Sequence, residues 1–238
     1  MEYQTGVYWC RGRVAKRNQD ALLLQQVLTR RGRVLMAAVC DGMGGTSQGE
    51  IAGGYVAERL QEWFYTEFLW MLCQKKRIWV IRRSLDRLVY HMQQQMRRYA
   101  GEEGISLGTT MTVLLLWENA WLVWHLGDSR AYRLRCGRLQ QLTTDHVQGA
   151  GKLTKCVGSF GSFVPEHAVG VPRNGEGFLL CSDGYWRRMA QQEIKDVLAP
   201  AQLKEEAQIE RRLKEIGEAC MRRGERDNLS AVYLKLHK

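Results

Sequence analysis

Four aspartates, each beside an apolar run, are the residues of this 238-residue chain whose pattern points most directly to chemistry. Asp41 and Asp183 each follow an apolar run and precede a glycine, whereas Asp20 and Asp227 come shortly before such a run. Converging carboxylates repel one another and raise each other's pKa unless a cation neutralises them. Mg²⁺ and Mn²⁺ prefer hard oxygen ligands of this kind. The four aspartates therefore predict a carboxylate metal site.

The segment that Asp41 opens, Asp-Gly-Met-Gly-Gly at 41–45, adds a second chemical signal. Three glycines in five residues permit unusual dihedrals and a close approach of the backbone to a ligand. A helix that begins just beyond favours an anion such as phosphate. A tight strand–helix turn with a capping aspartate explains the same segment without any ligand. No Gly-Lys-Ser/Thr follows, which excludes a P-loop.

Length and composition fit one domain that covers residues 1–238. The chain is 45% hydrophobic, has only three prolines, and contains no linker-like tract that would divide it. Its first residues lack a signal pattern, and its most apolar helical stretch, 63–73, is too short to cross a membrane. We therefore expect a cytoplasmic protein with no membrane segment.

The formal charge of +10 comes from scattered basic doublets, most of them on predicted helices, where a solvated face is the default. No basic motif interleaved with aromatic residues is present, so nucleic-acid binding is not expected. Attraction to acidic or phosphorylated partners is the milder consequence of the charge. Seven widely spaced cysteines without a Cys-x-x-Cys pair argue against a disulfide framework or structural zinc.

Strand and helix patterns are segregated along the chain rather than alternating, which indicates an α+β fold. The four strand patterns between residues 109 and 142 are interpreted as an antiparallel meander. The packing expected is a four-layer α/β/β/α sandwich, two antiparallel sheets flanked by helix pairs, with several strand ends along one edge. Strands are predicted at 21–28, 34–40, 109–117, 120–126, 130–135, 138–142, 178–182 and 229–236, and helices at 47–71, 79–100, 191–198 and 202–223.

Several short motifs together carry far more information than any one of them, and in this order they resemble the metal-dependent Ser/Thr protein phosphatases (PPM, type 2C) in their bacterial form. The resemblance extends from residue 12 to residue 236. The matching stretches are Asn-Gln-Asp at 18–20, Val-Cys-Asp-Gly-Met-Gly-Gly at 39–45, Gly-Glu at 49–50, Gly-Thr-Thr at 108–110, Gly-Asp-Ser-Arg-Ala-Tyr at 127–132, Leu-Thr-Thr-Asp-His at 142–146, Leu-Cys-Ser-Asp-Gly at 180–184 and Asp-Asn at 227–228.

The resemblance implies a phosphoprotein phosphatase with two Mn²⁺ or Mg²⁺ ions at one edge of the sandwich. Asp41 would bridge the ions, and the carbonyl of Gly42 would bind one of them. Asp183 and Asp227 would complete the protein ligands of the other ion, with Asp20 nearby. The implied partners are phosphoserine and phosphothreonine proteins and a cognate Ser/Thr kinase.

Two further positions have implied roles, and the chemistry follows from the ions. Asp128 matches a position associated with a third, weaker metal, and Asn228 matches a residue that orients Asp227. Two ions about 3.5–4 Å apart lower the pKa of a shared water and clamp a phosphoryl oxygen. The water can then attack phosphorus in line, without a covalent enzyme intermediate.

Departures from the family pattern concern the phosphate and the rim of the site. The family's usual phosphate-binding arginine is replaced by Ala15; Arg13 and Arg17 would share the face of Ala15 on a strand, and are candidates to replace it. Simple solvated basic residues are the alternative for both. Thr46 stands where bacterial members often carry histidine, which leaves the general acid without an assignment.

Two features further along the chain bear on the same question. His146 lies in a matching motif, but a lone histidine is more often structural. Only residues 147–152 stand where the family usually has a longer flap, and a shorter flap would open the site. The departures together motivate an alternative: a catalytically weak or inactive module that binds phosphoproteins or a partner kinase.

Overall fold

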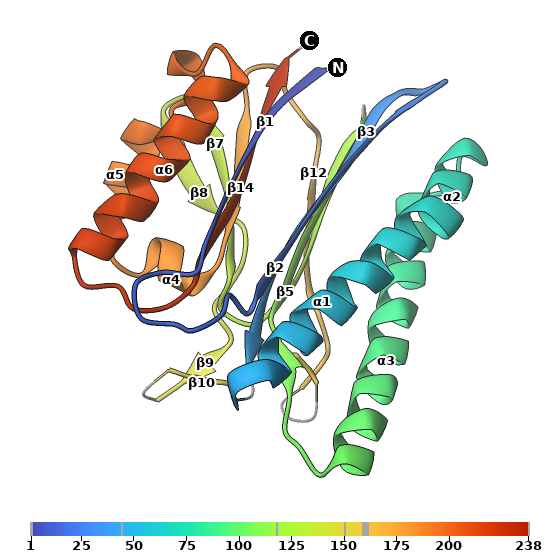
Figure 1. Cartoon of the computed structure of the whole chain (residues 1–238). Helices are drawn as coiled ribbons and strands as arrows, with labels where there is room; N and C mark the ends of the chain where they lie inside the picture. The colour runs from blue at the N-terminus through green and yellow to red at the C-terminus, as the bar shows by residue number, and fades with distance from the viewer. Residues whose placement is uncertain (1, 44, 118, 150, 159–161, 238) are drawn as a thin grey trace.

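Two antiparallel sheets pack face to face, and helices cover the outer side of each (Figure 1). The structure is a computed structural model that describes residues 2–43, 45–117, 119–149, 151–158 and 162–237. Gly44 of the glycine-rich segment and the side chain of Thr46 lie outside this description. The expected four-layer α/β/β/α sandwich is confirmed.

The larger sheet has seven strands, in the order β11-β4-β3-β5-β6-β12 with β2 paired to β3. Its strands are β2 (Asp20–Thr29), β3 (Gly32–Met43), β4 (Gly108–Thr109), β5 (Met111–Trp117), β6 (Ala120–Leu126), β11 (Val157–Gly158) and β12 (Glu166–Gly170). Side chains of β3 alternate between two cores: Leu35 and Val39 face the other sheet, whereas Met36 and Cys40 face the helices. Because both faces are covered, the strand is apolar at every position from 34 to 40.

The smaller sheet has five strands in the order β1-β14-β13-β7-β8. These are β1 (Glu2–Cys10), β14 (Leu229–His237), β13 (Gly177–Cys181), β7 (Arg130–Arg135) and β8 (Arg138–Gln141). Strand β1, which the sequence analysis did not predict, pairs antiparallel with β14 from Glu2 opposite His237 to Cys10 opposite Leu229. A two-stranded hairpin of β9 (Val147–Gln148) and β10 (Lys152–Leu153) stands apart from both sheets.

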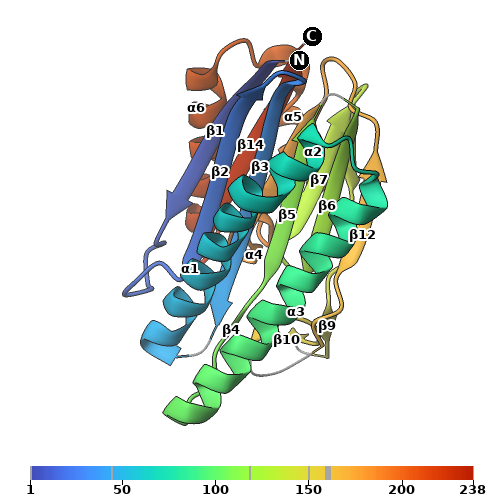
Figure 2. The same ribbon diagram turned by 90° about the vertical axis from the view of Figure 1, so that its right-hand side faces the viewer.

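Helices α1 (Gly45–Trp63), α2 (Leu69–Cys73) and α3 (Ile78–Glu103) lie across the outer face of the seven-stranded sheet, with a π-helical turn at Phe64–Phe68 (Figure 2). The five-stranded sheet is covered by α4 (Asp183–Trp186), α5 (Gln191–Val197), a 3₁₀ turn (Pro200–Gln202) and α6 (Glu206–Arg222). Helix α6 buries Ile209, Leu213, Ile216 and Cys220, the spacing of one helical face.

The meander predicted between residues 109 and 142 is wrong at its centre. Strands β5 and β6 pair with each other in the larger sheet, but β7 and β8 belong to the smaller one. The segment 127–129 crosses between the sheets, and Gly127 is held there by two hydrogen bonds with His146. Alternation identifies strands but does not say which sheet a strand joins. The crossing brings Asp128 to the edge where other strands end.

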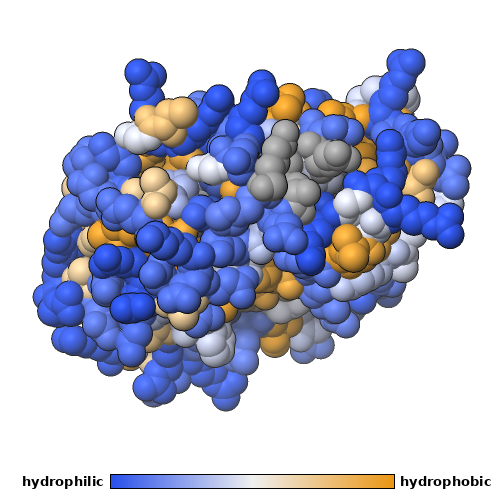
Figure 3. All heavy atoms as spheres, turned by 90° about the horizontal axis from the view of Figure 1, so that it is seen from above, coloured by the Kyte–Doolittle hydropathy of each residue, from blue (hydrophilic) through white to orange (hydrophobic). Residues whose placement is uncertain are grey.

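Both chain ends lie at one end of the sandwich, and the β9–β10 hairpin lies at the opposite end (Figure 1). The surface at the chain ends is mainly hydrophilic, with scattered hydrophobic residues (Figure 3). Within the described part of the chain, no helix combines the length and apolar character needed to cross a membrane.

Candidate active site

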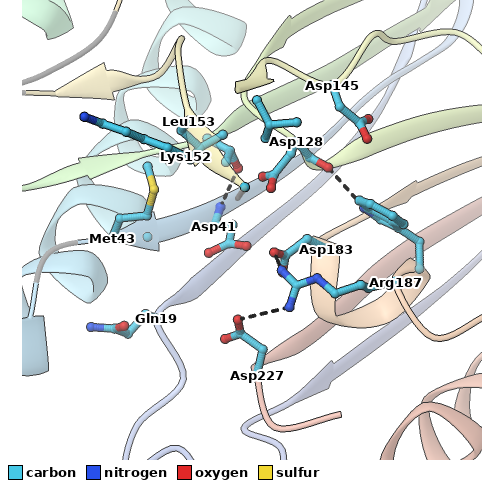
Figure 4. Close-up of a pocket in the computed structure, with 15 residues that line it drawn as sticks. Gln19, Asp41, Met43, Asp128, Asp145, Lys152, Leu153, Asp183, Arg187 and Asp227 are labelled. Carbon is cyan, nitrogen blue, oxygen red and sulfur yellow. Dashed lines mark hydrogen bonds and ion pairs between the residues drawn. The ribbon is translucent and has the colours of Figure 1, made fainter. Parts of the chain in front are cut away.

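A pocket of about 670 Å³ lies at the edge of the sandwich near the β9–β10 hairpin (Figure 4). Its lining comes from the end of β3, the crossing between sheets, the hairpin, α4 and the segment before β14. The charged side chains that line it are the acidic Asp41, Asp128, Asp145, Asp183 and Asp227 and the basic Lys152 and Arg187. This excess of carboxylates over basic groups defines the chemistry of the pocket.

Asp20 and Asp41 are directly opposite each other in the β2–β3 pairing. Thr110 lies between β4 and β5, which both pair with β3, and hydrogen bonds at this point fix the backbone of Asp41. The carbonyl of Asp41 accepts from Thr109 Oγ1 (3.0 Å) and from the N–H of Thr110 (2.9 Å), and the N–H of Asp41 donates to Thr110 Oγ1 (2.9 Å). The indole of Trp9 on β1 donates to the carbonyl of Asp20 (2.9 Å), which ties the two sheets together here. Asp20 is not part of the pocket lining; it is buried, with 4% of its surface exposed, and borders a separate groove beside β2.

Gly42 allows the chain to pass tightly between these aspartates and α1. Its N–H donates to the carbonyl of Gln19 (3.2 Å), and a Cβ at this position would run into the carbonyl of Gly49. Any side chain would therefore force β3 away from the helix that follows it. The glycine predicted beside Asp41 is required by this close approach.

Asp183 and Asp227 meet because β13 and β14 are antiparallel neighbours. Asp183 lies two residues after the end of β13, and Asp227 lies two residues before the start of β14, so both lie at the same edge of the sheet. Gly184 permits the contact, since a Cβ there would collide with the carbonyl of Asn228. The backbone N–H of Asn228 donates to Asp227 Oδ1 (2.8 Å).

The side chain of Asn228 fastens the N-terminal segment to this edge. Its Nδ2 donates to the carbonyls of Arg11 (2.9 Å) and Arg17 (3.1 Å), and its Oδ1 accepts from the N–H of Gln19 (2.8 Å). Asn228 therefore holds the chain that leads into Asp20 with its side chain, while its backbone N–H donates to the Asp227 carboxylate.

Burial and mutual repulsion make the carboxylates difficult to ionise in the protein alone. Burial raises the pKa of Asp20 to about 6, and the nearby Asp227 charge adds to the rise. Burial also raises the pKa of Asp41 well above its usual value, with further contributions from Asp20, Asp227 and Asp128, while Arg187 opposes the rise. Burial raises the pKa of Asp128 too. Each shift has the direction that an added cation would reverse.

Arg187 is the basic side chain set among these carboxylates. It lies one helical turn after Asp183, forms an ion pair with the Asp183 carboxylate, and places Nη1 4.0 Å from Asp227 Oδ2. Figure 4 shows its guanidinium between the two aspartates. Trp186 beside it donates from its indole N–H to the carbonyl of Asp128 (3.0 Å).

The residues fit a hard divalent cation by donor type and by unsatisfied oxygens. Both carboxylate oxygens of Asp20 and Oδ1 of Asp183 are buried and accept no hydrogen bond within the described part of the chain. Among those described residues, no three acidic, histidine or cysteine side chains converge closely enough to hold an ion as they stand. The guanidinium of Arg187 lies between two of the oxygen donors, where a cation would otherwise be. Buried carboxylate oxygens without a hydrogen-bond partner, next to oxygens that already pair with a guanidinium, suit Mg²⁺ or Mn²⁺.

Of the residues predicted from the sequence, the structure brings Asp41, Gly42, Asp128, Asp183 and Asp227 into one pocket lining. Asp20 and Asn228 do not line the pocket: Asp20 is paired opposite Asp41 on the neighbouring strand, and Asn228 binds the segment that leads into Asp20.

Arg13 and Arg17 do not line this pocket. Arg17 is largely exposed, pairs with Glu50 (3.2 Å) and borders a separate groove beside β2. The expectation that Arg13 and Arg17 share the face of Ala15 on a strand is wrong, because the segment around Ala15 is irregular and side chains do not alternate between two faces there.

The sequence analysis missed the basic and aromatic part of the pocket. Arg130 forms a bidentate pair with Asp145 (2.7 and 2.9 Å) and stacks on the ring of Trp186 at 3.2 Å from its centroid. Arg187 was interpreted only as half of a basic doublet. A signal was present, because a residue four positions after Asp183 on a helix must return to the same face.

His146 is part of the support for the site, in agreement with its structural interpretation. It is 6% exposed, and its ring stacks on that of His125 with centroids 4.8 Å apart. Its Nδ1 accepts from the N–H of Gly127 (3.1 Å), and its Nε2 lies 3.1 Å from Glu166. Burial lowers the pKa of His146. The β9–β10 hairpin that follows supplies Val147, Lys152 and Leu153 to the pocket, so the short flap segment borders it.

Known proteins of similar sequence and structure include several that are named as phosphatases. The protein phosphatase PhpP of Streptococcus pneumoniae is 26% identical over 207 residues, which are 79% of this chain and 80% of PhpP. PppA, a key regulatory component of T6SS in Pseudomonas aeruginosa, is 26% identical with a TM-score of 0.81, covering 99% of this chain and 98% of PppA. The catalytic domain of the phosphatase PstP in complex with two manganese ions is 23% identical, with a TM-score of 0.76 over 99% of each chain, and shows the same fold.

The family model of protein phosphatase 2C matches residues 12–231, a stretch that contains every aspartate of the pocket. The resemblance inferred from the short motifs is confirmed by this match over most of the chain. The chain therefore belongs to the protein phosphatase 2C family, the bacterial Ser/Thr protein phosphatases of the PPM type.

Proposed function

We propose that this chain hydrolyses phosphoserine or phosphothreonine in proteins, with two divalent cations, Mn²⁺ or Mg²⁺, held by the acidic pocket. The single observation that carries the proposal is the set of buried, unsatisfied carboxylate oxygens at one sandwich edge, in a chain of the protein phosphatase 2C family. The two manganese ions in the PstP catalytic domain, which has the same fold, support the choice of metal.

Asp41, Asp183 and Asp227 are the proposed metal ligands, with the Gly42 carbonyl and Asp20 beside them and Asp128 as the donor for a third ion. When bound, the ions supply the positive charge that acidifies a water and neutralises the phosphoryl oxygens. Thr109 and Thr110 keep the Asp41 backbone in place, and Asn228 fixes the chain beside Asp227. These contacts hold the ligands before substrate arrives.

The basic side chains of the pocket have a separate task in this proposal. Arg187 lies among the aspartates and can donate to the oxygens of a phosphoryl group, and Lys152 lines the same pocket from the hairpin. Water attacks phosphorus as the bond to the serine or threonine oxygen breaks, and the departing alkoxide takes a proton from solvent.

Phosphate release from a phosphothreonine peptide tests the proposal. The purified chain is assayed with 1 mM Mn²⁺, with Mg²⁺ and with excess chelator. Turnover that requires a divalent cation is expected, and full turnover in chelator would overturn the proposal. The same assay on a phosphotyrosine peptide is the substrate control.

A non-catalytic phosphoprotein-binding module is the second candidate, and the ion pair of Arg187 with Asp183 favours it, because the guanidinium already neutralises proposed metal ligands. Tight binding of the phosphothreonine peptide without phosphate release under any metal condition would select this alternative. A cognate kinase, a cytoplasmic location and a single catalytic unit spanning the chain stay predictions from the sequence.

A further inference from the structure

Arg187 is placed so that a divalent cation and its guanidinium cannot both neutralise the same carboxylates. Its guanidinium pairs with Asp183 and lies 4.0 Å from Asp227. The side chain is 42% exposed, which leaves it a path out of the acidic cluster toward solvent. Its position directly after α4, four residues on from Asp183, keeps its base next to the pocket wherever the guanidinium points.

A second anionic partner for the same guanidinium lies just outside the pocket. The carboxylate of Glu225 is 3% exposed, and its Oε1 lies 3.8 Å from Arg187 Nη1. Glu225 is itself fixed, because Oε1 accepts from the backbone N–H groups of Arg226 (2.8 Å) and Asp227 (3.1 Å). Arg188 approaches its other oxygen at 3.5 Å. Arg187 therefore has the buried carboxylate of Glu225 close by, and this carboxylate has no role in the proposed hydrolysis.

We propose that Arg187 is a resident cation that competes with divalent ions for Asp183 and Asp227 and thereby weakens the metal affinity of this phosphatase. Metal binding displaces the guanidinium from the two aspartates, and Glu225 retains it at the pocket rim. The inference rests on the proposed function only in taking this pocket as the metal site. It goes beyond that function because it assigns the control of metal occupancy to the residue that caps the C-terminus of α4.

The physical reason is charge balance within one set of oxygens. A carboxylate lone pair that accepts from a guanidinium N–H is not available to bind a metal ion, and the guanidinium and the metal ion repel each other at short range. Removal of the guanidinium leaves the carboxylates uncompensated, which increases their attraction for an ion. Removal of a neighbouring arginine that does not reach these oxygens has no such effect.

Calorimetric titration with Mn²⁺ tests the inference without relying on activity. We expect Arg187→Ala to bind the first Mn²⁺ at least tenfold more tightly than the unaltered chain. Arg188→Ala is the matched control, since Arg188 contacts Glu225 but neither aspartate, and its Mn²⁺ dissociation constant should stay within twofold. Arg187→Gln keeps most of the side-chain volume without charge and should tighten binding like the alanine variant.

Each contrary outcome is informative. Unchanged or weaker Mn²⁺ binding in the folded Arg187→Ala and Arg187→Gln variants would overturn the inference, as would tightening in the alanine variant alone, which would indicate bulk rather than charge. Phosphopeptide turnover is measured on the same samples. Turnover by the unaltered chain without a change in Mn²⁺ affinity refutes the competition and leaves the function standing, whereas tighter Mn²⁺ binding without turnover supports the competition and refutes the function.

Discussion

The two ends of strand β13 each carry a buried carboxylate, but the charges around the two differ. Glu176, just before the strand, is fully buried and meets Arg133 Nη2 at 2.5 Å and Arg135 Nε at 3.3 Å. Asp183, just after it, shares a pocket with Asp41, Asp128 and Asp227 as well as Arg187. The five residues of β13 thus separate two sites: at Glu176 the arginines outnumber the carboxylate, and at Asp183 the carboxylates outnumber the basic groups.

This contrast separates a structural ion pair from a site that needs something from outside. A buried carboxylate with two guanidiniums beside it is neutralised within the protein. Carboxylates that outnumber their internal cations stay protonated or recruit an ion. The same residue type on the same strand thus stabilises the fold at one end and predisposes it to bind metal at the other. Four changes test this comparison.

Asp41→Asn should have the largest effect, on activity. Loss of the carboxylate at the centre of the cluster should lower kcat/KM for a phosphothreonine peptide at saturating Mn²⁺ by at least about a thousandfold, on the order of 4 kcal/mol of transition-state stabilisation. Steady-state kinetics measure it, with circular dichroism as the check on folding. More than a tenth of the activity in the variant would contradict the assignment of this pocket.

Glu176→Gln should act on stability and not on metal binding. The free energy of unfolding should fall by roughly 3 kcal/mol, because the largely buried Arg133 loses the charge that neutralises it, while the half-exposed Arg135 is less affected. Urea unfolding measures the loss. Mn²⁺ affinity should stay within twofold, and a large change would mean that the two ends of β13 are not independent.

Asp20 should make the metal-free protein less stable as the pH rises. Its folded pKa of about 6 lies above the usual 3.8, so the folded state holds the extra proton between these values, and stability is lost as the pH rises from about 4 to about 6. The loss attributable to this group is roughly 2 to 3 kcal/mol. Urea unfolding of the unaltered chain and Asp20→Asn, in chelator from pH 4.5 to 7.5, isolates it: the two should converge at the acidic end, with the variant more stable at the neutral end. A difference independent of pH would refute the explanation.

Arg17→Ala should have the smallest effect. The Arg17–Glu50 pair is well exposed at both ends, and such pairs contribute a few tenths of a kcal/mol. KM for the phosphopeptide should change less than twofold, against an expected rise of about tenfold in Arg187→Ala, which removes a charge-assisted donor facing the phosphoryl space. A tenfold rise in Arg17→Ala would instead move the phosphate contact to the N-terminal segment, as the sequence suggested.

The elements that could be predicted are those whose pattern of apolar and polar residues directly reflects which faces of the element are buried. The apolar run of β3 reflects burial on both faces, and α6 shows the spacing of one buried face, so each was assigned from local pattern. Strand β1 was missed because its polar and small residues, such as Thr5 and Gly6, become a strand only by pairing with β14 at the far end of the chain. Which sheet β7 joins also depends on distant partners.

The residues of the site also fall into two groups, those that the local sequence identified and those that depend on distant pairing. Asp41, Asp183 and Asp227 were identified because each lies at a strand end beside a glycine or asparagine that the fold requires. Arg187 was not, because a basic doublet on a helix is usually solvated, and only the antiparallel pairing of β13 and β14 gives this one two aspartate neighbours. Residue type predicted the ligands, while the competing cation required the three-dimensional arrangement.

Asn228 bears on when the protein can first become active. Its hydrogen bonds join it to Arg11, Arg17 and Gln19, partners between 209 and 217 positions earlier in the chain. A nascent chain already contains Asp20, Asp41 and Asp183 before Asn228 is translated, yet it lacks the three hydrogen bonds by which Asn228 fastens the segment that leads into Asp20. Contacts this distant form late, since the loop between their ends must close first. During synthesis the polypeptide should therefore remain inactive as a phosphatase until Asn228 and β14 have been made.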